Sequence, residues 1–389
     1  MKKLRILFLL LFLFPYSIHA EELSFAEHAK SAIMIEASTG EVLFEKNADE
    51  KLAPASMTKM MSMLLLVESV EKGIIHWDDI VTISENASSM GGSQILLETN
   101  EKMSVDDLFK GIAVASGNDA VVAIAEYIAG TEKEFVKMMN EKAKSLGLQN
   151  TNFKNPHGLD ESDHYSSARD MALIAKELVS HPKVLEYTSI YEDYLRENTD
   201  RKIWLVNTNK LVRFYDGVDG LKTGYTEPAG YCLTATAKRN GMRIITVVMG
   251  EPDSKTRNAE TTSMLDYAFA QYETETILSK DRILGTIEVE KGKQKYVNLI
   301  PLREVSLLNK KGEKKKEASY QIKVQNVKAP IKKGEEVGTI EIQIDGKSLK
   351  GVPITVEKDI QKANLLELYG RNLSDIFSGS ITVNESQSI

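Results

Sequence analysis

The sequence is poor in the residues that build disulfides and metal centres. Its one cysteine, Cys232, excludes an internal disulfide, so the stability of the fold has to come from core burial. Of its six histidines only His157 and His164 lie at all close together, and neither falls in a metal-ligand spacing. The sequence therefore indicates neither a metal site nor a cofactor.

Membrane-spanning apolar runs and an excess of positive charge are also missing. The formal net charge is −7, which argues against nucleic acid as a partner. The apolar stretch 6–15 follows Lys2, Lys3 and Arg5, ends in a short polar segment closing at Ala20, and is too short to cross a bilayer comfortably. This is the layout of a cleaved signal peptide, so we expect residues 1–20 to be removed and the chain to be exported.

Two kinds of periodicity predict an α+β domain. Residues 32–37 and 41–45 have the pattern of a β-hairpin, and a strong turn signal at Asn240-Gly241 joins the last two of three later strands. Those strands are expected at 218–226, 231–237 and 242–249. Helices are expected at 57–72, 105–115, 119–129, 132–146, 168–179 and 259–272. We therefore predict that residues 21–274 form one antiparallel sheet, closed by the two ends of the segment, with a helical region inserted.

The composition changes near residue 275. Alternating segments separated by glycine and lysine turns predict a small β-sandwich over residues 275–356. A basic cluster within it fits a solvated loop, with contact to an anionic polymer or membrane as the sharper alternative. Its members are Lys310, Lys311, Lys314, Lys315 and Lys316.

The tail, residues 357–389, carries apolar residues at helical spacing between Asp359 and Phe377. An amphipathic helix here is a candidate for peripheral membrane contact. Its charges are mixed, however, with Lys362 and Arg371 beside Asp359 and Asp375, which matches an anionic surface poorly.

The strongest candidate for chemistry is the stretch Pro54-Ala55-Ser56-Met57-Thr58-Lys59. In a helix the spacing of Ser56 and Lys59 puts their side chains on one face, roughly 5–6 Å apart at Cβ. The apolar run behind them would surround the lysine with protein rather than water. The tetrad recurs at Ser69 and Ser180, so it is weak alone, and a serine that caps the helix remains an alternative for Ser56.

Two further motifs follow along the chain. Ser116-Gly117-Asn118 lies between two helical runs, where a loop can aim a hydroxyl and an amide into a cleft, although a simple turn has the same pattern. Lys222-Thr223-Gly224 lies on a predicted strand, where the glycine allows a ligand to approach the backbone and the lysine supplies positive charge. Taken singly, it also fits an edge-strand lysine before a turn.

The order Ser-x-x-Lys, Ser-x-Asn, Lys-Thr-Gly is typical of active-site serine enzymes of the penicillin-recognising class. With these motifs the chain resembles the serine-type D-alanyl-D-alanine carboxypeptidases, the low-molecular-mass penicillin-binding proteins, particularly forms from spore-forming Gram-positive bacteria. The resemblance covers nearly the whole chain. The stretches that match the family pattern are 54–59, 115–119, 155–159 and 218–226. Position 225 varies in the family between histidine and aromatics, so Tyr225 leaves the assignment intact.

The resemblance implies a transpeptidase-like, β-lactamase-like catalytic domain followed by a β-rich domain, with the C-terminal segment at the membrane. It implies export to the outer face of the cytoplasmic membrane or the cell-wall space. The expected substrate is a peptidoglycan stem peptide ending in D-Ala-D-Ala, with β-lactam antibiotics as covalent inhibitors. The likeness to sporulation-type forms suggests a role in trimming the spore wall.

The mechanism expected from these residues is acyl transfer. An uncharged Lys59, its pKa lowered by burial and by the Lys222 cation, deprotonates Ser56, which attacks the peptide carbonyl between the two D-alanines. Ser116 relays a proton to the departing D-alanine, and backbone N–H groups of Ser56 and Tyr225 hold the oxyanion.

Substrate binding is expected from a second set of residues. Asn118 would fix the substrate amide, Lys222 and Thr223 would bind the terminal carboxylate, and Gly224 would let the substrate approach the strand. Arg257 is either an assistant in carboxylate binding or a structural arginine at a helix start.

Three alternatives stay open at this point. A class A β-lactamase would carry a Glu-x-x-Leu-Asn loop between Asn118 and Lys222, and no such run occurs there. A D,D-endopeptidase acting on cross-links would use the same motifs. A non-catalytic wall-binding protein with a decayed site is disfavoured because every motif residue is present.

Overall fold

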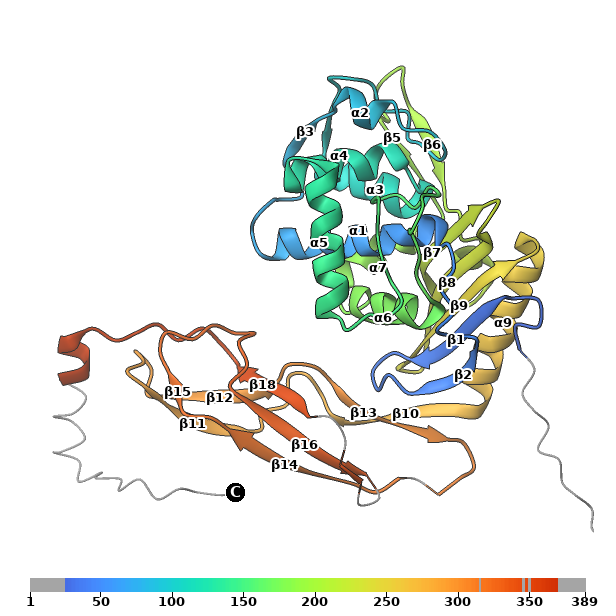
Figure 1. Cartoon of the computed structure of the whole chain (residues 1–389). Coiled ribbons are helices and arrows are strands. Elements are labelled where there is room, and N and C mark those ends of the chain that lie inside the picture. The colour runs from blue at the N-terminus through green and yellow to red at the C-terminus, as the bar shows by residue number, and fades with distance from the viewer. Residues whose placement is uncertain (1–24, 315, 345–346, 349–350, 370–389) are drawn as a thin grey trace, which may run out of the picture.

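The computed structural model describes residues 25–314, 316–344, 347–348 and 351–369 (Figure 1). The predicted signal peptide and the end of the predicted tail helix lie outside these residues. The described chain is α+β, with a mixed domain followed by a β-rich one, as the sequence predicted.

The first domain is built on a five-stranded antiparallel sheet. Its strand order is β2-β1-β9-β8-β7. The strands are β1 (Ser31–Glu36), β2 (Val42–Lys46), β7 (Val218–Thr226), β8 (Gly230–Arg239) and β9 (Met242–Glu251). Because β1 pairs with β9, with Ile33 opposite Val247, the two ends of the segment close the sheet, and this prediction is confirmed. β7 forms one edge of the sheet.

Both faces of this sheet are covered. Alternating side chains of β1 enter different cores, with Ile33 and Ile35 on the side of the helical region and Met34 on the opposite side. On the opposite side Met264 and Leu265 of α9 (Ser254–Gln271) pack against the sheet. The sequence predicted that this helix starts at Ala259, but it starts five residues earlier because Asp253 caps it by accepting from Lys255 N and Thr256 N.

The helical region contains the five long helices that the sequence predicted. They are α1 (Lys59–Glu71), preceded by the 3-10 turn η1 (Ala55–Thr58), α3 (Val105–Ala115), α4 (Asn118–Ala129), α5 (Glu132–Ser145) and α6 (Ala168–Leu178). Shorter elements were not predicted. They are α2 (Glu85–Ser88), α7 (Pro182–Thr188), α8 (Leu211–Phe214) and the hairpins β3 (Ile80–Thr82) with β4 (Lys102–Ser104) and β5 (Glu192–Leu195) with β6 (Ile203–Val206).

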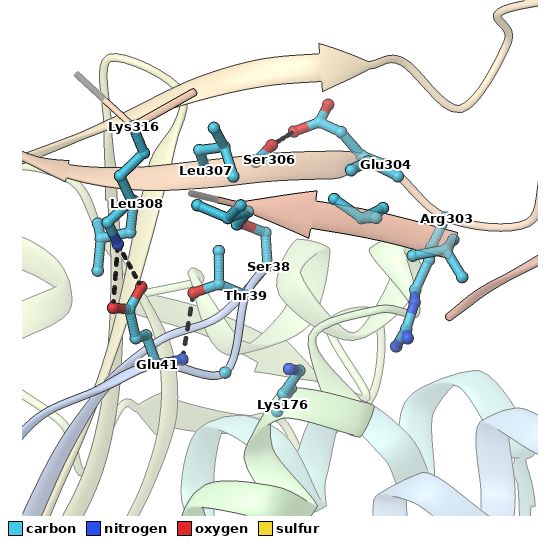
Figure 2. A pocket seen from close by; sticks show the side chains of 15 residues that line it. Ser38, Thr39, Glu41, Lys176, Arg303, Glu304, Ser306, Leu307, Leu308 and Lys316 are labelled. Atoms are coloured by element: carbon cyan, nitrogen blue, oxygen red, sulfur yellow. Dashed lines mark hydrogen bonds and ion pairs between the residues drawn. The ribbon is translucent and has the colours of Figure 1, made fainter. Parts of the chain in front are cut away.

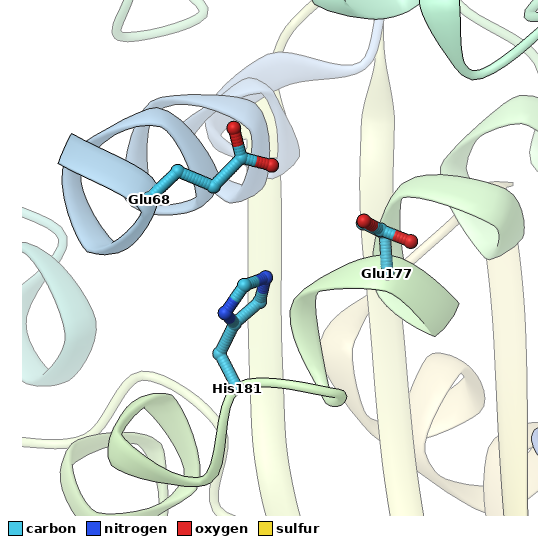
Figure 3. Close-up of side chains that lie close together, drawn as sticks. All are labelled: Glu68, Glu177 and His181. Atoms are coloured by element: carbon cyan, nitrogen blue, oxygen red, sulfur yellow. The ribbon is translucent and has the colours of Figure 1, made fainter. Parts of the chain in front are cut away.

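An ion-pair cluster joins α1, α5 and α6 at the far end of α1. Glu68, Glu177 and His181 converge there (Figure 3). Lys142 contacts Glu68 and lies 3.6 Å from Glu177, and His181 Nδ1 lies 2.9 Å from a carboxylate oxygen of Glu71. The lysine between the two carboxylates identifies this cluster as a set of structural ion pairs.

The second domain is a β-structure of two packed sheets, as predicted. A ribbon of β10 (Tyr272–Leu278) and β13 (Val305–Lys310) packs through Leu278 and Val305 onto the core of the larger sheet. The larger sheet has the order β14-β16-β18-β12-β11-β15, with β17 on β16. Its strands are β11 (Gly285–Glu290), β12 (Tyr296–Pro301), β14 (Ala318–Val324), β15 (Val327–Lys328), β16 (Gly338–Ile344), β17 (Lys347–Ser348) and β18 (Val352–Val356).

The two domains meet beside the β1–β2 turn. Lys316 Nζ lies 3.2 Å from a carboxylate oxygen of Glu41, and a cavity of about 710 Å³ lies between the domains (Figure 2). Other members of the basic cluster bind groups of the same chain, such as Lys310 to Glu313 and Lys311 to the carbonyl of Phe269. These contacts favour the solvated-loop interpretation of that cluster.

The start of the tail differs from its prediction. The helix expected from Asp359 begins only at Leu365, because Ile360 is buried in the second domain and its backbone pairs with Ile331. Helical residues 365–369 expose Leu366 and Tyr369 to solvent. Within the described residues we find no helix with both the length and the apolarity needed to cross a membrane.

Candidate active site

The predicted nucleophile and its base face each other where η1 becomes α1. Lys59 Nζ donates to Ser56 Oγ at 3.0 Å, and Lys59 is completely buried. Neither η1 nor α1 has a side-chain cap, so the capping role considered for Ser56 is wrong. The Ser-x-x-Lys motif that begins at Ser69 is different, because the Ser69 hydroxyl donates to the carbonyl of Leu65 within the same helix.

Three acceptors hold the Lys59 amine. Besides Ser56, it donates to Asn118 Oδ1 at 2.6 Å and to the His157 carbonyl at 2.8 Å. Burial lowers the pKa of Lys59 well below its usual value, the nearby Lys222 cation lowers it further, and Asp119 opposes both effects. The three acceptors position this amine, while burial and the Lys222 charge favour its uncharged form, which keeps two donors and accepts from Ser56 Oγ, as a base requires.

The His157 carbonyl is fixed by a tight turn packed on η1. Gly158 has a φ of +90°, and a Cβ there would lie 1.9 Å from the Ala55 carbonyl oxygen. Asn155 Oδ1 accepts from Gly158 N at 2.7 Å, and Ser62 Oγ donates to the Pro156 carbonyl at 2.7 Å. The contact of this turn with Lys59 was not predicted, because a backbone acceptor can belong to any residue type.

Asn118 connects Lys59 to a loop on the other side of the site. Its Nδ2 donates to the Gly91 carbonyl at 2.6 Å, and its backbone N–H donates to the Ser93 carbonyl at 2.7 Å. Gly92 next to this contact has a φ of +81°, and a Cβ there would lie 2.7 Å from Asn118 Nδ2. The loop therefore approaches the site closely only because it has a glycine at this position.

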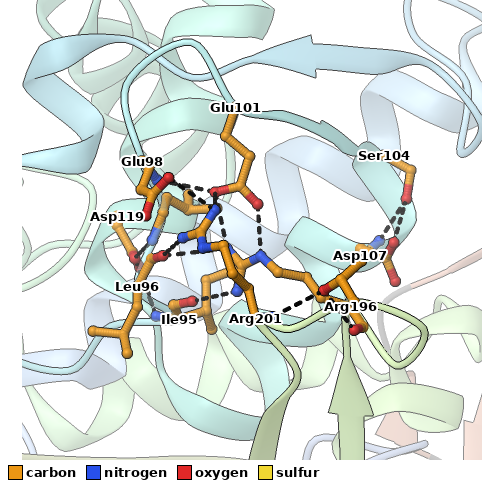
Figure 4. Close-up of polar contacts among 11 residues, drawn as sticks. Ile95, Leu96, Glu98, Glu101, Ser104, Asp107, Asp119, Arg196 and Arg201 are labelled. Atoms are coloured by element: carbon orange, nitrogen blue, oxygen red, sulfur yellow. Dashed lines mark hydrogen bonds and ion pairs between the residues drawn. The ribbon is translucent and has the colours of Figure 1, made fainter.

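The same loop is anchored from behind by charged groups (Figure 4). The Asp119 carboxylate accepts from Ile95 N at 3.1 Å and from Leu97 N at 3.0 Å. Arg196 donates to the Ile95 carbonyl at 2.9 Å and pairs with Glu101 at 2.6 Å. These contacts fix both the N–H and the carbonyl of Ile95, and they make Asp119 and Arg196 supports of the site that the sequence interpretation missed.

Ser116 lies at the junction of α3 and α4. Its φ of 64° is in the left-handed region, which is uncommon for a serine, and the residue is buried. Within the described part of the chain its hydroxyl makes no hydrogen bond. The junction that sets its backbone also sets Asn118, two residues later, against Lys59.

The β7 strand passes directly beside Ser56, the predicted nucleophile. A Cβ on Gly224 would lie 2.8 Å from the Pro54 carbonyl oxygen and 3.2 Å from Ser56 N, so this position requires glycine. Thr223 Oγ1 donates to Thr208 Oγ1 at 2.7 Å, a contact that the sequence interpretation did not include. Tyr225 is 56% exposed and lies with its ring centroid 4.4 Å from that of Tyr231.

Lys222 and Arg257 add buried positive charge on this side. Lys222 is 1% exposed, and its Nζ donates to the Thr223 carbonyl at 2.9 Å. Burial and the neighbouring Arg257 cation lower the pKa of Lys222 to about 7. Arg257, on α9, is buried and donates to Asn258 Oδ1. The surplus of cations suits a ligand that carries a carboxylate.

The structure thus brings together most of the predicted residues. Direct contacts or close approach link Ser56 to Lys59 and Gly224, and Lys59 to Asn118. Lys222 acts on the pKa of Lys59 through its charge, and Arg257 acts in the same way on Lys222.

Comparison with models of known protein families assigns the first domain to one of them. Residues 18–253 match the model described as D-alanyl-D-alanine carboxypeptidase. The chain belongs to this family. Residues 272–362 match the model of the penicillin-binding protein 5 C-terminal domain, which agrees with the β-rich second domain.

Relatives and solved structures of D-alanyl-D-alanine carboxypeptidases support the assignment over most of the chain. D-alanyl-D-alanine carboxypeptidase DacF of Bacillus subtilis is 54% identical over 351 residues, which cover 90% of each chain. The structure of penicillin binding protein 5 from Haemophilus influenzae is 35% identical, covers 86% of this chain and 98% of that one, and has a TM-score of 0.67. The ampicillin-bound penicillin-binding protein D2 from Listeria monocytogenes is 32% identical, covers 64% of this chain and 99% of that one, and has a TM-score of 0.57.

The class predicted from the sequence, a serine-type D-alanyl-D-alanine carboxypeptidase, is therefore confirmed. The predicted fold, a transpeptidase-like α+β domain followed by a β-rich domain, is confirmed as well.

Proposed function

We propose that this D-alanyl-D-alanine carboxypeptidase removes the terminal D-alanine from peptidoglycan stem peptides through an acyl-enzyme on Ser56. The observation that carries the proposal is the contact between Ser56 Oγ and the buried Lys59 amine, whose pKa is lowered by burial and by Lys222. A hydroxyl beside an uncharged amine in a site sheltered from water can become a nucleophile at neutral pH.

Acylation begins when Lys59 takes the proton of Ser56 Oγ. The oxygen attacks the carbonyl carbon between the two D-alanines, and the oxyanion accepts from the N–H groups of Ser56 and Tyr225. The peptide C–N bond then breaks, and the departing D-alanine leaves with a proton relayed by Ser116. Water attacks the resulting ester, the second product leaves as a carboxylate, and Ser56 regains its proton.

Substrate binding uses the cations beside β7. Lys222 and Thr223 bind the terminal carboxylate, and the Arg257 charge on the same side adds to the attraction. Asn118 already binds both Lys59 and the Gly91 carbonyl, so we assign it the positioning of Lys59 as well as contact with the substrate amide through its second Nδ2 hydrogen. Gly224 keeps the strand close enough to Ser56 for one substrate to span both.

β-Lactams should acylate the same serine. The Listeria penicillin-binding protein D2 was solved with ampicillin bound, which supports penicillin as a probe of this site. Slow release of penicillin together with release of D-alanine from a pentapeptide would separate this function from a β-lactamase. Cleavage of cross-linked muropeptides in preference to pentapeptides would favour an endopeptidase.

The sequence supports a proposal for where in the cell the protein acts. The basic and apolar start of the chain supports a signal peptide over residues 1–20 and export to the outer face of the cytoplasmic membrane or the cell-wall space. Likeness to sporulation-type forms supports a role in trimming the spore wall. Exposed Leu366 and Tyr369 support peripheral membrane contact by the segment 357–389. The change in composition supports a division into a catalytic domain, 21–274, and a β-rich domain, 275–356, with strand β10 (Tyr272–Leu278) crossing the boundary.

A fluorescent penicillin tests the nucleophile directly. Wild-type protein should be labelled covalently, and Ser56→Ala should lose both the label and D-alanine release from a pentapeptide. The matched control is Ser69→Ala, which changes another copy of the Ser-x-x-Lys motif and should label as wild type does. Covalent labelling of Ser56→Ala at the wild-type rate contradicts the assignment.

A further inference from the structure

The edge of β7 sets the direction in which a substrate lies. Within the described residues β7 pairs only with β8, so its other edge can pair with an extended peptide. In the proposed function the terminal carboxylate lies at Lys222 and Thr223, and the attacked carbonyl lies beside Gly224, next to Ser56. The substrate residues before the cleaved bond therefore continue towards Tyr225 and Thr226.

A carboxylate lies at that end of the strand. Thr226 Oγ1 donates to Asp160 Oδ1 at 2.8 Å, and Asp160 is exposed. Within the described residues Asp160 Oδ2 has no hydrogen-bond partner. Asp160 directly follows Leu159, which is 37% exposed, in the segment that also supplies the His157 carbonyl to Lys59. The position of this carboxylate is thus tied both to β7 and to the catalytic amine.

The distance along β7 from Lys222 and Thr223 to Asp160 singles out one residue of the substrate that can reach Asp160. Two residues of extended chain span roughly 7 Å, both in the substrate and along β7, so the residue two positions before the terminal D-alanine lies at the end of β7 that carries Tyr225 and Thr226. An amine at the end of a lysine-like side chain reaches roughly 6 Å from its Cα, far enough to approach a carboxylate held by the next residue of the strand.

The charges along the cleft change from positive at one end of β7 to negative at the other. Buried cations Lys222 and Arg257 lie on the side that would receive the substrate carboxylate, and Asp160 lies at the opposite end of β7. A peptide with a carboxylate at its end and an ammonium two residues earlier complements both ends of this cleft.

On these grounds we infer that Asp160, held by Thr226, is a specificity-determining residue that binds a free ammonium group on the side chain immediately before the D-alanyl-D-alanine pair. This inference rests on the proposed function, because that function fixes the direction of the substrate. This contact with Asp160 would make the enzyme selective for stem peptides whose diamino residue still has a free side-chain amine, in preference to stem peptides in which that amine is acylated.

Two peptides test the inference. Both have the sequence acetyl-Lys-D-Ala-D-Ala, and in one the side-chain amine is acetylated. An exposed ion pair contributes enough for wild-type kcat/KM to be about two- to fivefold higher for the free amine at low ionic strength. This preference should shrink as salt is raised, because screening weakens the pair.

Variants connect the preference to Asp160. In Asp160→Asn, which keeps the shape and an acceptor for Thr226, the ratio of the two kcat/KM values should fall to about one. Asp163→Asn removes an exposed carboxylate from the same segment and should keep the wild-type ratio. Thr226→Val removes the hydroxyl that holds Asp160 and should lower the ratio, which gives a second test if Asp160→Asn is not labelled by penicillin.

The outcomes separate the two proposals. Equal kcat/KM for both peptides in the wild type, or a preference that persists in Asp160→Asn, overturns the inference and leaves the proposed function in place. Failure of the wild type to release D-alanine from either peptide overturns the proposed function and the inference together.

Discussion

Replacing Gly92 by alanine should loosen the contact between Asn118 and the amine of Lys59, the proposed base. The new methyl group would lie 2.7 Å from Asn118 Nδ2, whereas non-bonded carbon atoms pack at about 3.5–4.0 Å, so the amide has to move. Its Oδ1 accepts from Lys59 at 2.6 Å. Lys59 becomes charged as it takes the proton of Ser56, and a hydrogen bond to a charged group contributes about 1.5–3 kcal/mol. Losing it in the transition state converts to a loss of roughly 10- to 150-fold in the acylation rate.

The substitution also strains the loop. Gly92 has a φ of +81°, and an alanine in a left-handed conformation costs about 1–2 kcal/mol. We therefore expect a modest fall in thermal stability together with the larger fall in acylation.

The assay is the second-order rate of covalent labelling by a fluorescent penicillin, with thermal unfolding measured on the same samples. Gly91→Ala is the matched control, because a Cβ there meets nothing within 4 Å, and it should label as fast as wild type. If Gly92→Ala also labels at the wild-type rate, the loop does not position Lys59 through Asn118 and the reasoning is refuted.

Two further predictions concern protons. Lys222→Gln removes a cation that lowers the pKa of Lys59, so that pKa should rise and the rising limb of the pH profile of penicillin acylation should move to higher pH; an unmoved limb contradicts this. Burial lowers the pKa of His164, which contacts Thr58 Oγ1, from 6.5 to about 4. Between these values the unfolded chain binds the proton and the folded one does not, so the free energy of unfolding should fall by roughly 3 kcal/mol as the pH drops from 6.5 to 4. Urea unfolding should show a shallower fall for His164→Gln, and equal slopes for the two proteins would exclude His164 as the cause.

Long periodic segments could be predicted from the sequence because their burial repeats along the chain. The helix 105–115 was predicted at its observed bounds, and the order of the motifs identified Ser56, Lys59 and Lys222 before their contacts were known. Helix α9 was predicted too short because its first turn is polar and its start depends on the cap at Asp253.

Other parts depend on contacts between distant segments and could not be predicted. The His157 carbonyl reaches Lys59 across 98 positions, and no residue type indicates a backbone acceptor. The β5–β6 hairpin has strands of four residues, too short for a clear alternation. The tail was predicted as a helix from Asp359 because its apolar spacing fits one, but burial of Ile360 against the second domain outweighs that local pattern.

The pairing of β1 with β9 has a consequence for when this enzyme can first act. Ser31 lies opposite Met249, so a growing chain already contains Ser56, the proposed nucleophile, long before the partner strand exists. A polypeptide that ends before β7 has neither the strand that flanks Ser56 nor Lys222, whose charge lowers the pKa of Lys59, the proposed base. Nascent molecules should therefore be unreactive towards penicillin until nearly the whole first domain has been made, and reactivity should appear abruptly rather than grow with chain length.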